Sequence, residues 1–389
     1  MSRSVYVAGV GMTKFGVLKE SLTELASSSA LEAIDDAGIS DYKIDRLVIG
    51  SQNPDEFVGI GHLSTLITDH LGLIPSGATR VETGPSSGSS AFEVGYSFIA
   101  SGLAESVLVV CAEKMSEVER AEASRILAKV LSNENEVRYG ATPTALAAML
   151  AHRYMHDYGL SRDDLSLVPI KAHKHGAYNP LAHFQKEITL DDVRSSRVVA
   201  QPLTIFDCCP TSDGAAAALL LSEDALTKIA GNEKAVKVLG VGHATDYHSM
   251  QHRKSLTSMN GTKVASELAF RMAKCSVNDV DVFELHDAFS ILELIHMEDL
   301  GISKIGKAID LVKSKETFAD GKYPINTTGG LKARGHPTGA TGMAQIHDIV
   351  CQLRSTAPVK LQVDNPKIGL AHNIGGFGDN FVVSVLERT

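Results

Sequence analysis

The most distinctive stretch of the sequence is GGLKARGHPTGATG, residues 329–342. Its many glycines predict a loop whose backbone can come close to a ligand, because glycine has no side chain to block the approach. His336 stands inside this loop, directly before Pro337, which stiffens the turn. A purely structural turn does not need a histidine, so we interpret the stretch as part of a functional site. A helix expected over 343–353 would then direct its first N–H groups at an anion or oxyanion.

Two further loops follow predicted strands. His286 comes after a buried strand expected over 280–285, and the carboxyl ends of strands are where α/β proteins build sites. A histidine there exchanges protons near neutral pH, although a surface histidine is an equally good interpretation. Asn373, Gly375 and Gly376 belong to HNIGGFG, residues 372–378, between strands expected over 368–371 and 380–386. Backbone N–H groups in such a loop can form an oxyanion hole; taken alone, a tight turn is the simpler interpretation.

Strand and helix patterns alternate along most of the chain. This alternation predicts an α/β protein with a parallel sheet covered on both faces. Ser21, followed by Glu24, predicts a capping box at the start of the first helix. The expected strands cover residues 4–10, 45–50 and 106–112, and the expected helices cover residues 21–37, 59–71, 86–101 and 263–275.

The two halves of the chain share a pattern. Residues 34–50 and 272–288 each combine a helix end, a short turn and an acidic-hydrophobic strand. We therefore predict an internal duplication, interrupted by a charged segment that lacks a buried strand. The expected units are residues 1–115 together with 201–235, the inserted loop domain 116–200, and residues 236–389.

Composition excludes several classes of protein. The 389 residues carry a net charge of −9 and no basic stripe, which argues against nucleic acid as a partner. No apolar run reaches the length of a membrane span. The five cysteines form no CxxC pair, so we expect neither a disulfide framework nor a metal site. The amino terminus leads directly into a strand pattern without a signal peptide, and we expect a cytoplasmic protein with no bound cofactor.

Together the three loops resemble the thiolase superfamily. GGLKARGHPTGATG resembles its C-terminal signature, and HDAF at 286–289 resembles the HDCF loop of sterol carrier protein-type thiolases. The resemblance covers nearly the whole chain and implies a duplicated five-layer α-β-α-β-α fold with an inserted loop domain. It further implies an acyl-coenzyme A thioester as ligand and a homodimer or homotetramer. His336, His286 and Asn373 would carry the chemistry.

The same resemblance suggests how the loop domain contributes. In thiolases this domain contacts coenzyme A. His173, Lys174 and His175 lie in its histidine- and lysine-rich stretch, and positive charge there would recognise the phosphates of coenzyme A. A solvated basic face is an equally good interpretation.

The position of the thiolase nucleophile differs from the family pattern. Thiolases read close to VEAACASGG there, and this chain reads VETGPSSGS over 81–89, which aligns Pro85 with the reactive cysteine. Proline supplies no nucleophile and no N–H group. The second reactive cysteine is also replaced, by Ala288 or Asn373, depending on the type of thiolase. The nearby serines are expected to be caps and packing residues of the following helix: Ser86, Ser87, Ser89 and Ser90.

Three functions fit this pattern. The first is a thiolase-like protein, similar to an acetyl-CoA acetyltransferase, that does not form an acyl-cysteine. The second is a cysteine-independent aldolase or lyase acting on acyl-CoA; steroid side-chain aldolases of the superfamily resemble this and work with a small zinc-ribbon and OB-fold partner. In that case Tyr247, flanked by His243 and His248, is a candidate proton carrier. The third is a non-catalytic subunit that binds coenzyme A in such a complex.

Overall fold

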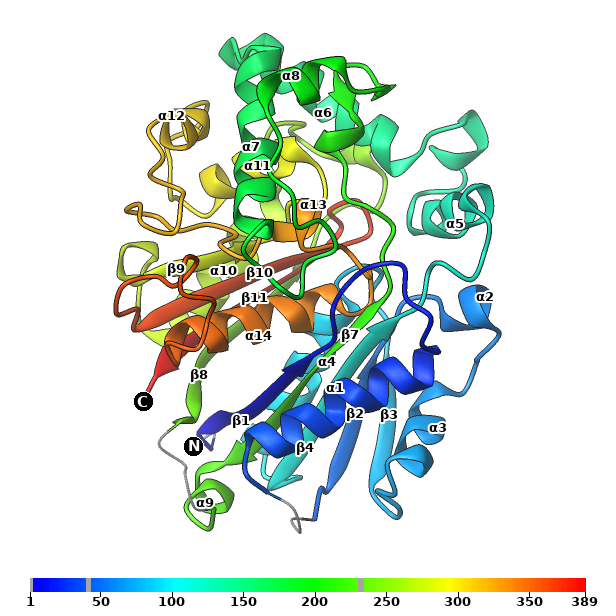
Figure 1. Cartoon of the computed structure of the whole chain (residues 1–389), viewed down its shortest axis with the longest axis vertical. Helices are drawn as coiled ribbons and strands as arrows, with labels where there is room; N and C mark the ends of the chain where they lie inside the picture. The colour runs from blue at the N-terminus through cyan, green and yellow to red at the C-terminus, as the bar shows by residue number, and fades with distance from the viewer. Residues whose placement is uncertain (1–2, 40–42, 230–233) are drawn as a thin grey trace.

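The computed structural model describes residues 3–39, 43–229 and 234–389. Parts of the predicted units and of the predicted repeat at 1–2, 40–42 and 230–233 lie outside these described residues. Nine strands form one large sheet in the order β3-β2-β4-β7-β1-β8-β11-β10-β9 (Figure 1). They are β1 Val5–Met12, β2 Arg46–Gly50, β3 Gly77–Val81, β4 Ser106–Glu113, β7 Gly214–Ser222, β8 Val236–Thr245, β9 Val282–Leu285, β10 Ile368–Gly375 and β11 Asn380–Arg388.

The sheet consists of two half-sheets with the same pairing pattern. In the first half, β2 and β4 are parallel, and β4, β7 and β1 are antiparallel neighbours in turn. In the second half, β9 and β10 are parallel, and β10, β11 and β8 repeat the antiparallel series. Only two residue pairs join β1 to β8, at the centre of the sheet. The repeated order agrees with the predicted duplication.

The prediction of a parallel sheet was wrong for five of the eight strand pairings of the large sheet. A parallel pair needs a crossover connection, which the helices after β2 and β9 supply. However, β10 and β11 are joined by a tight turn at 376–379, and such a short connection produces an antiparallel pair. The inserted loop domain separates β4 from β7 and brings the chain back in the antiparallel direction. Alternation of helices and strands alone does not reveal these two connections.

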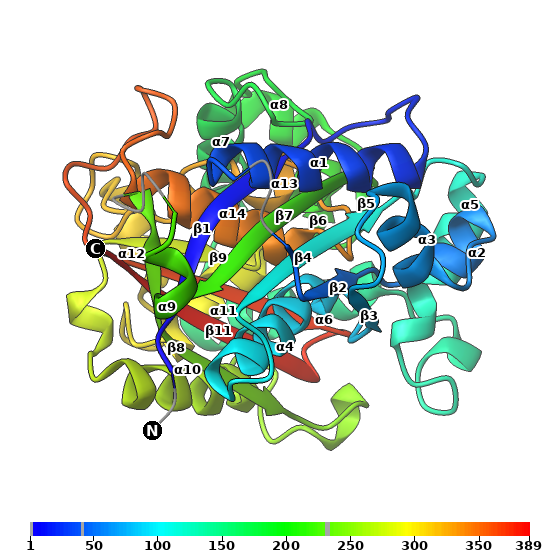
Figure 2. The same cartoon turned by 90° about the horizontal axis from the view of Figure 1, so that it is seen from below.

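Five layers stack as the resemblance implied (Figures 1 and 2). One outer hydrophobic core contains residues of α1, α3 and the first half-sheet. The middle core contains residues of α4 and α14, which lie between the two half-sheets. The other outer core contains residues of α10, α11 and the second half-sheet. The helices are α1 Leu22–Asp36, α2 Pro54–Val58, α3 Leu63–His70, α4 Ser87–Ala100, α5 Arg120–Leu127, α6 Pro143–Tyr158, α7 Arg162–Gly176, α8 Leu190–Ser195, α9 Glu223–Leu226, α10 Asn260–Ala273, α11 Ser290–Asp299, α12 Ala308–Lys313, α13 Gly330–Ala333 and α14 Thr341–Leu353.

Small residues bring α4 and α14 together in the middle layer. A Cβ atom on Gly88 would lie only 2.8 Å from the Met343 nitrogen, and one on Gly342 would lie 2.4 Å from the Ser89 nitrogen. Side chains at these glycines would therefore push the two helices apart. Because both helices begin here, the small-residue pattern of the sequence brings the Pro85 loop beside the loop that carries His336.

The predicted ends of helices and strands can be compared with the structure at three places. The capping box of Ser21 and Glu24 is present at the start of α1. The helix predicted over 59–71 corresponds to the shorter α3; α2 precedes it and was not predicted, and Gly59 ends α2 in the left-handed conformation. The strand predicted over 368–371 continues as β10 to Gly375, so that Asn373 lies inside a strand and not in a loop.

A buried ion pair joins the loop domain to the second half of the chain. Lys171 of α7 contacts Glu293 of α11 at 2.7 Å, and both side chains are fully buried. Asn326 donates to the second Glu293 oxygen at 3.0 Å and also accepts the Leu285 N–H at 2.7 Å. This network connects the loop domain to the end of β9, directly before His286. The boundaries of the three units stay predictions.

Candidate active site

The three loops singled out in the sequence meet at one buried point. The Asn373 amide nitrogen lies 2.8 Å from Nδ1 of His286. The rings of His286 and His336 are nearly perpendicular, with centroids 5.1 Å apart. All three side chains are buried, His336 being the most exposed at 6%. The fold thus brings together the residues predicted to carry the chemistry.

Thr341 contacts the ring of His336. Its hydroxyl oxygen lies 2.6 Å from His336 Nδ1 and 3.0 Å from the Pro337 carbonyl oxygen. The hydroxyl can donate its one proton to either of them, and the Pro337 carbonyl oxygen also accepts the backbone N–H groups of Ala340 and Thr341. The contact thus orients the ring through Nδ1.

Asn373 determines the tautomer of His286. The Asn373 amide N–H donates to His286 Nδ1, so the ring proton resides on Nε2. His286 Nε2–H is therefore a hydrogen-bond donor. Within the described residues, the Asn373 carbonyl oxygen has no hydrogen-bond partner although it is buried, and a buried acceptor of this kind is available to a ligand or a water molecule.

Both imidazoles are neutral near physiological pH. Burial and, to a smaller extent, the Arg334 guanidinium lower the pKa of His336 to about 3. Burial also lowers the pKa of His286 well below its ordinary value, and His336 contributes in the same direction. A neutral imidazole can accept a proton at one nitrogen and donate one from the other without carrying a fixed charge.

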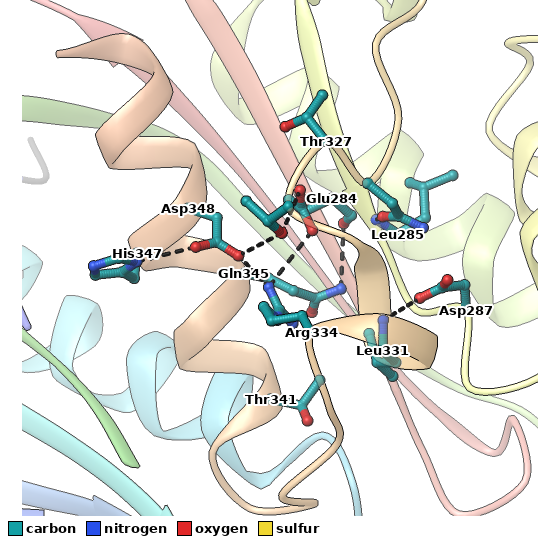
Figure 3. A network of polar contacts seen from close by, with 12 residues as sticks. Glu284, Leu285, Asp287, Thr327, Leu331, Arg334, Thr341, Gln345, His347 and Asp348 are labelled. Carbon is teal, nitrogen blue, oxygen red and sulfur yellow. Dashed lines mark hydrogen bonds and ion pairs between the residues drawn. The ribbon is translucent and has the colours of Figure 1, made fainter. Parts of the chain in front are cut away.

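A buried ion pair joins the loop of His286 to the glycine-rich loop. One Asp287 carboxylate oxygen accepts the Leu331 N–H at 2.7 Å (Figure 3), and the other contacts the Lys332 ammonium. Both charged side chains are fully buried. Sequence reasoning did not select Asp287 or Lys332, although each is the neighbour of a residue in a selected motif.

Arg334, in the same glycine-rich loop, contacts two buried carboxylates. Its guanidinium contacts Asp348 of α14 and lies 3.6 Å from the Glu284 carboxylate at the end of β9 (Figure 3). Burial, with the adjacent Asp348 charge, raises the pKa of Glu284 to about 8. Against the effect of burial, Arg334 lowers the pKa of Asp348. The ionised pair is thus Arg334 with Asp348, directly beside His336.

Glu113 connects the first half-sheet to the glycine-rich loop. It is fully buried at the end of β4 and accepts the Gln52 N–H at 2.7 Å, the Asn53 N–H at 3.2 Å and the Gly339 N–H at 3.1 Å. A Cβ atom on Gly339 would lie 2.6 Å from the Glu113 oxygen. Only glycine fits at 339, which explains one glycine of the signature by packing.

Pro85 is buried, directly before the start of α4. A Cβ atom on its neighbour Gly84 would lie 2.9 Å from the Gly376 nitrogen, and one on Gly375 would lie 2.4 Å from the Ser86 hydroxyl. The Pro85 loop therefore packs directly against the turn that follows β10. Gly375 itself belongs to the β10–β11 ladder, where it is paired with Asn380.

The serines after Pro85 are packing residues. Ser86 occupies the N-cap position of α4, but its side chain makes no capping hydrogen bond. Its hydroxyl donates instead to the Thr83 carbonyl oxygen at 2.7 Å, and the Ser87 hydroxyl donates to the Gly84 carbonyl oxygen at 2.6 Å. The expected capping role is thus corrected for Ser86, because its hydroxyl is used within the turn.

A polar cleft of about 840 Å³ opens beside this loop. Gly84 and Gly376 line it, whereas His286 and His336 are not among its lining residues. The Gln52 side chain also lines it, is only 2% exposed, and has no partner for its amide among the described residues. Charged side chains surround the cleft: Asp55, Arg80, Glu82, Lys129, Asp246, His248 and Asp379.

The structure corrects the expected phosphate-binding role of two histidines in α7. His173 and His175 are each 4% exposed. Their Nδ1 atoms contact the carbonyl oxygens of Lys186 at 3.2 Å and Asn326 at 3.0 Å, and burial lowers both pKa values, that of His175 to about 4. A buried neutral imidazole does not attract phosphate by charge. Lys174 is exposed, and its role stays a prediction.

Tyr247 lies outside the buried cluster. It is 57% exposed on the loop after β8. Its neighbour His248 contacts Asp379 at 2.5 Å, and both line the cleft. His243 contacts Asn380 at 3.2 Å, and Asn380 in turn accepts from Ser86 of the Pro85 loop. Tyr247 is thus placed beside the cleft and not beside His336.

Within residues 3–39, 43–229 and 234–389, no group of three or more His, Cys, Asp or Glu side chains is arranged to hold a metal ion. No helix in the same residues has the length and apolar character needed to cross a bilayer.

The fold and the site define the class: a duplicated α/β protein with a two-histidine candidate active site where its halves meet. A thiolase N-terminal domain model matches residues 5–224, and a thiolase C-terminal domain-like model matches residues 242–388. The chain belongs to the thiolase family. The expected thiolase fold is thereby confirmed.

Individual relatives agree with this assignment. The acetyl-CoA acetyltransferase of Methanothermobacter thermautotrophicus is 38% identical over 99% of this chain and 100% of its own length. Sterol carrier protein 2 of Gallus gallus is 35% identical over 96% of this chain and 70% of its own length. Among solved structures, the Ltp2-ChsH2(DUF35) aldolase has a TM-score of 0.84 and 25% identity over 99% of this chain and 98% of that chain. The chain is thus similar to acetyl-CoA acetyltransferases.

Proposed function

We propose that this protein acts on acyl-coenzyme A thioesters and makes or breaks a carbon–carbon bond without an acyl-cysteine. The observation that carries the proposal is the combination of Pro85 with an intact, complementary histidine pair. Proline provides no nucleophile, and the packing of Gly84 against Gly376 leaves Pro85 buried in a well-formed turn. Family membership supports the thioester as the ligand, and the polar cleft beside Gly84 is our proposed entry for it.

The other cysteines do not compensate for Pro85. Cys111 lies beside the start of α4, with its sulfur 3.8 Å from the Gly88 carbonyl oxygen. Burial raises its pKa to about 12, so the thiolate is disfavoured. Burial likewise raises the pKa of Cys209, beside the His286 loop, to about 12. Covalent catalysis by either residue would require a thiolate that its surroundings oppose.

The histidine pair is suited to retro-aldol cleavage of a β-hydroxyacyl thioester. His336 Nε2 takes the proton of the β-hydroxyl group, the bond between Cα and Cβ breaks, and a carbonyl product forms. The electron pair of that bond passes into a thioester enolate, whose oxygen accepts a hydrogen bond from His286 Nε2–H. The His336 imidazolium then protonates Cα, which releases the shortened acyl-CoA and restores the base. The reverse sequence is an aldol addition.

An installed thiol tests the central idea. Pro85→Cys places a sulfur in the loop beside His336, and incubation with acetyl-CoA should give an acetyl adduct in the intact mass. The natural chain should give none, but should cleave a β-hydroxyacyl-CoA. Ser101→Cys, an exposed thiol at the end of the same helix, is the matched control and should remain unmodified. An acetyl adduct on the natural chain, with thiolytic turnover of acetoacetyl-CoA, would overturn the proposal.

A second candidate is a subunit that binds coenzyme A in a complex and has no activity alone. The aldolase that resembles this chain combines Ltp2 with a DUF35 protein, ChsH2, and this favours a small zinc-ribbon and OB-fold partner here. The discriminating measurement is coenzyme A binding by calorimetry together with co-purification from the native source. Binding without turnover, plus a small partner that restores turnover, would support the complex. A homodimer or homotetramer stays a prediction and is measured in the same preparation.

A further inference from the structure

The outward face of α14 carries a thiol and an imidazole side by side. His347 and Cys351 are separated by four residues, the spacing that aligns side chains on a helix. Every other residue of Thr341–Leu353 is buried, whereas these two are partly exposed. The Cys351 sulfur lies 3.7 Å from Nε2 and 4.0 Å from Nδ1 of His347. The only solvent-facing positions of this helix thus hold a nucleophile beside a cation-forming group.

Asp348 keeps this imidazole charged. His347 Nδ1 donates to one Asp348 oxygen at 3.0 Å, and the other Asp348 oxygen is held by Arg334. Burial opposes the charged form, but Cys351 and Asp348 together raise the pKa of His347 well above its ordinary value. The Arg334 charge compensates that of Asp348, so Asp348 does not repel a thiolate at Cys351. An imidazolium next to a thiol stabilises the thiolate.

The remaining cysteines have the opposite surroundings. Burial raises the pKa of Cys111 and Cys209 to about 12 each. Cys275 is partly exposed, like Cys351, but burial and the neighbouring Asp279 charge raise its pKa. Among the described residues, only Cys351 has an imidazole nitrogen within 4.0 Å of its sulfur.

We propose that Cys351 is an activated thiol that forms a mixed disulfide with low-molecular-weight disulfides. The Cys351 thiolate attacks one sulfur of the small disulfide, its S–S bond breaks, and the departing thiolate takes up the proton released when Cys351 ionised. The reaction exchanges one disulfide for another, and the small disulfide is the oxidant. His347 stabilises the attacking thiolate through its charge.

The connection to the candidate active site follows from the contacts. Asp348 binds His347 through one oxygen and Arg334 through the other, and Arg334 lies two residues before His336. A mixed disulfide at Cys351 removes the thiolate from His347 and thereby changes the charge balance around Asp348. The thiol site stands independently of the proposed function, because it uses neither His286 nor Pro85.

Differential alkylation tests the thiol directly. The native protein is treated with limiting iodoacetamide near neutral pH, and each cysteine is quantified by peptide mass spectrometry. Cys351 should be alkylated about tenfold faster than Cys275, because the His347 imidazole contacts the Cys351 sulfur and an adjacent cation activates a thiol. His347→Gln should reduce the Cys351 rate to that of Cys275. His152→Gln, the same change at an exposed position of α6, should leave it unchanged.

A disulfide probe completes the test. Oxidised glutathione should add to the natural chain at Cys351, and the Cys351→Ser variant should acquire no adduct under the same conditions. Equal alkylation rates at Cys351 and Cys275, or an unchanged rate in His347→Gln, would overturn the proposal. So would an adduct formed preferentially at another cysteine.

Discussion

Lys332→Met should destabilise the protein strongly, although it removes only one charge. Lys332 and Asp287 are both fully buried, so loss of the ammonium leaves the Asp287 carboxylate charged and unpaired in the interior. Breaking a buried ion pair in this way costs about 3–5 kcal/mol. The Leu331 N–H still reaches the carboxylate, but this hydrogen bond to a charged group, which contributes about 1.5–3 kcal/mol, is also present in the natural chain and does not offset the loss. We therefore expect a loss of at least about 3 kcal/mol.

The assay is urea unfolding followed by circular dichroism, with linear extrapolation to water. Lys307→Met is the control, since Lys307 and Asp310 form an exposed pair at 3.9 Å whose contribution is about 0–1 kcal/mol. The double variant with Asp287→Asn should be more stable than Lys332→Met alone. Asparagine removes the unpaired charge and keeps an acceptor for Leu331. A loss below about 1 kcal/mol, or a double variant less stable than the single one, would refute the reasoning.

Two further predictions concern His336 and Glu113. His336→Ala should abolish turnover of a β-hydroxyacyl-CoA while coenzyme A still binds in calorimetry; unchanged turnover would remove His336 from the mechanism. Burial raises the pKa of Glu113 from 4.5 to about 7, so the folded state binds the proton more tightly than the unfolded state. Stability should therefore fall by about 3 kcal/mol as pH rises from about 4.5 to about 7. In urea unfolding at several pH values, Glu113→Gln should lose this fall, and a parallel profile would contradict the assignment.

Sequence reasoning found the site because its signals are local. His286 stands in a short motif directly after β9, His336 in the glycine-rich loop before α14, and Asn373 inside β10; each motif can be recognised from consecutive residues. The capping box at Ser21 and the small residues of α4 are equally local. Each of these signals depends on neighbours in the sequence, which can be inspected without a structure.

The parts that sequence reasoning missed depend on distant partners. A charged residue in a glycine-rich loop suggests exposure, yet Lys332 and Arg334 are fully buried because Asp287 and Asp348 neutralise them. The exposure of His173 and His175 was likewise overestimated, since their carbonyl partners lie in distant segments. Sequence reasoning also ended the strand at residue 371, whereas β10 continues to Gly375.

The contacts of the two histidines depend on both local and distant residues. The Thr341 hydroxyl, which lies 2.6 Å from Nδ1 of His336, is only five residues away in the sequence. Asn373 is 87 residues from His286 and donates to its Nδ1, and an aliphatic side chain at 373 has no N–H group to do so. In the proposed function, Asn373 therefore orients His286 as the hydrogen-bond donor to the enolate oxygen.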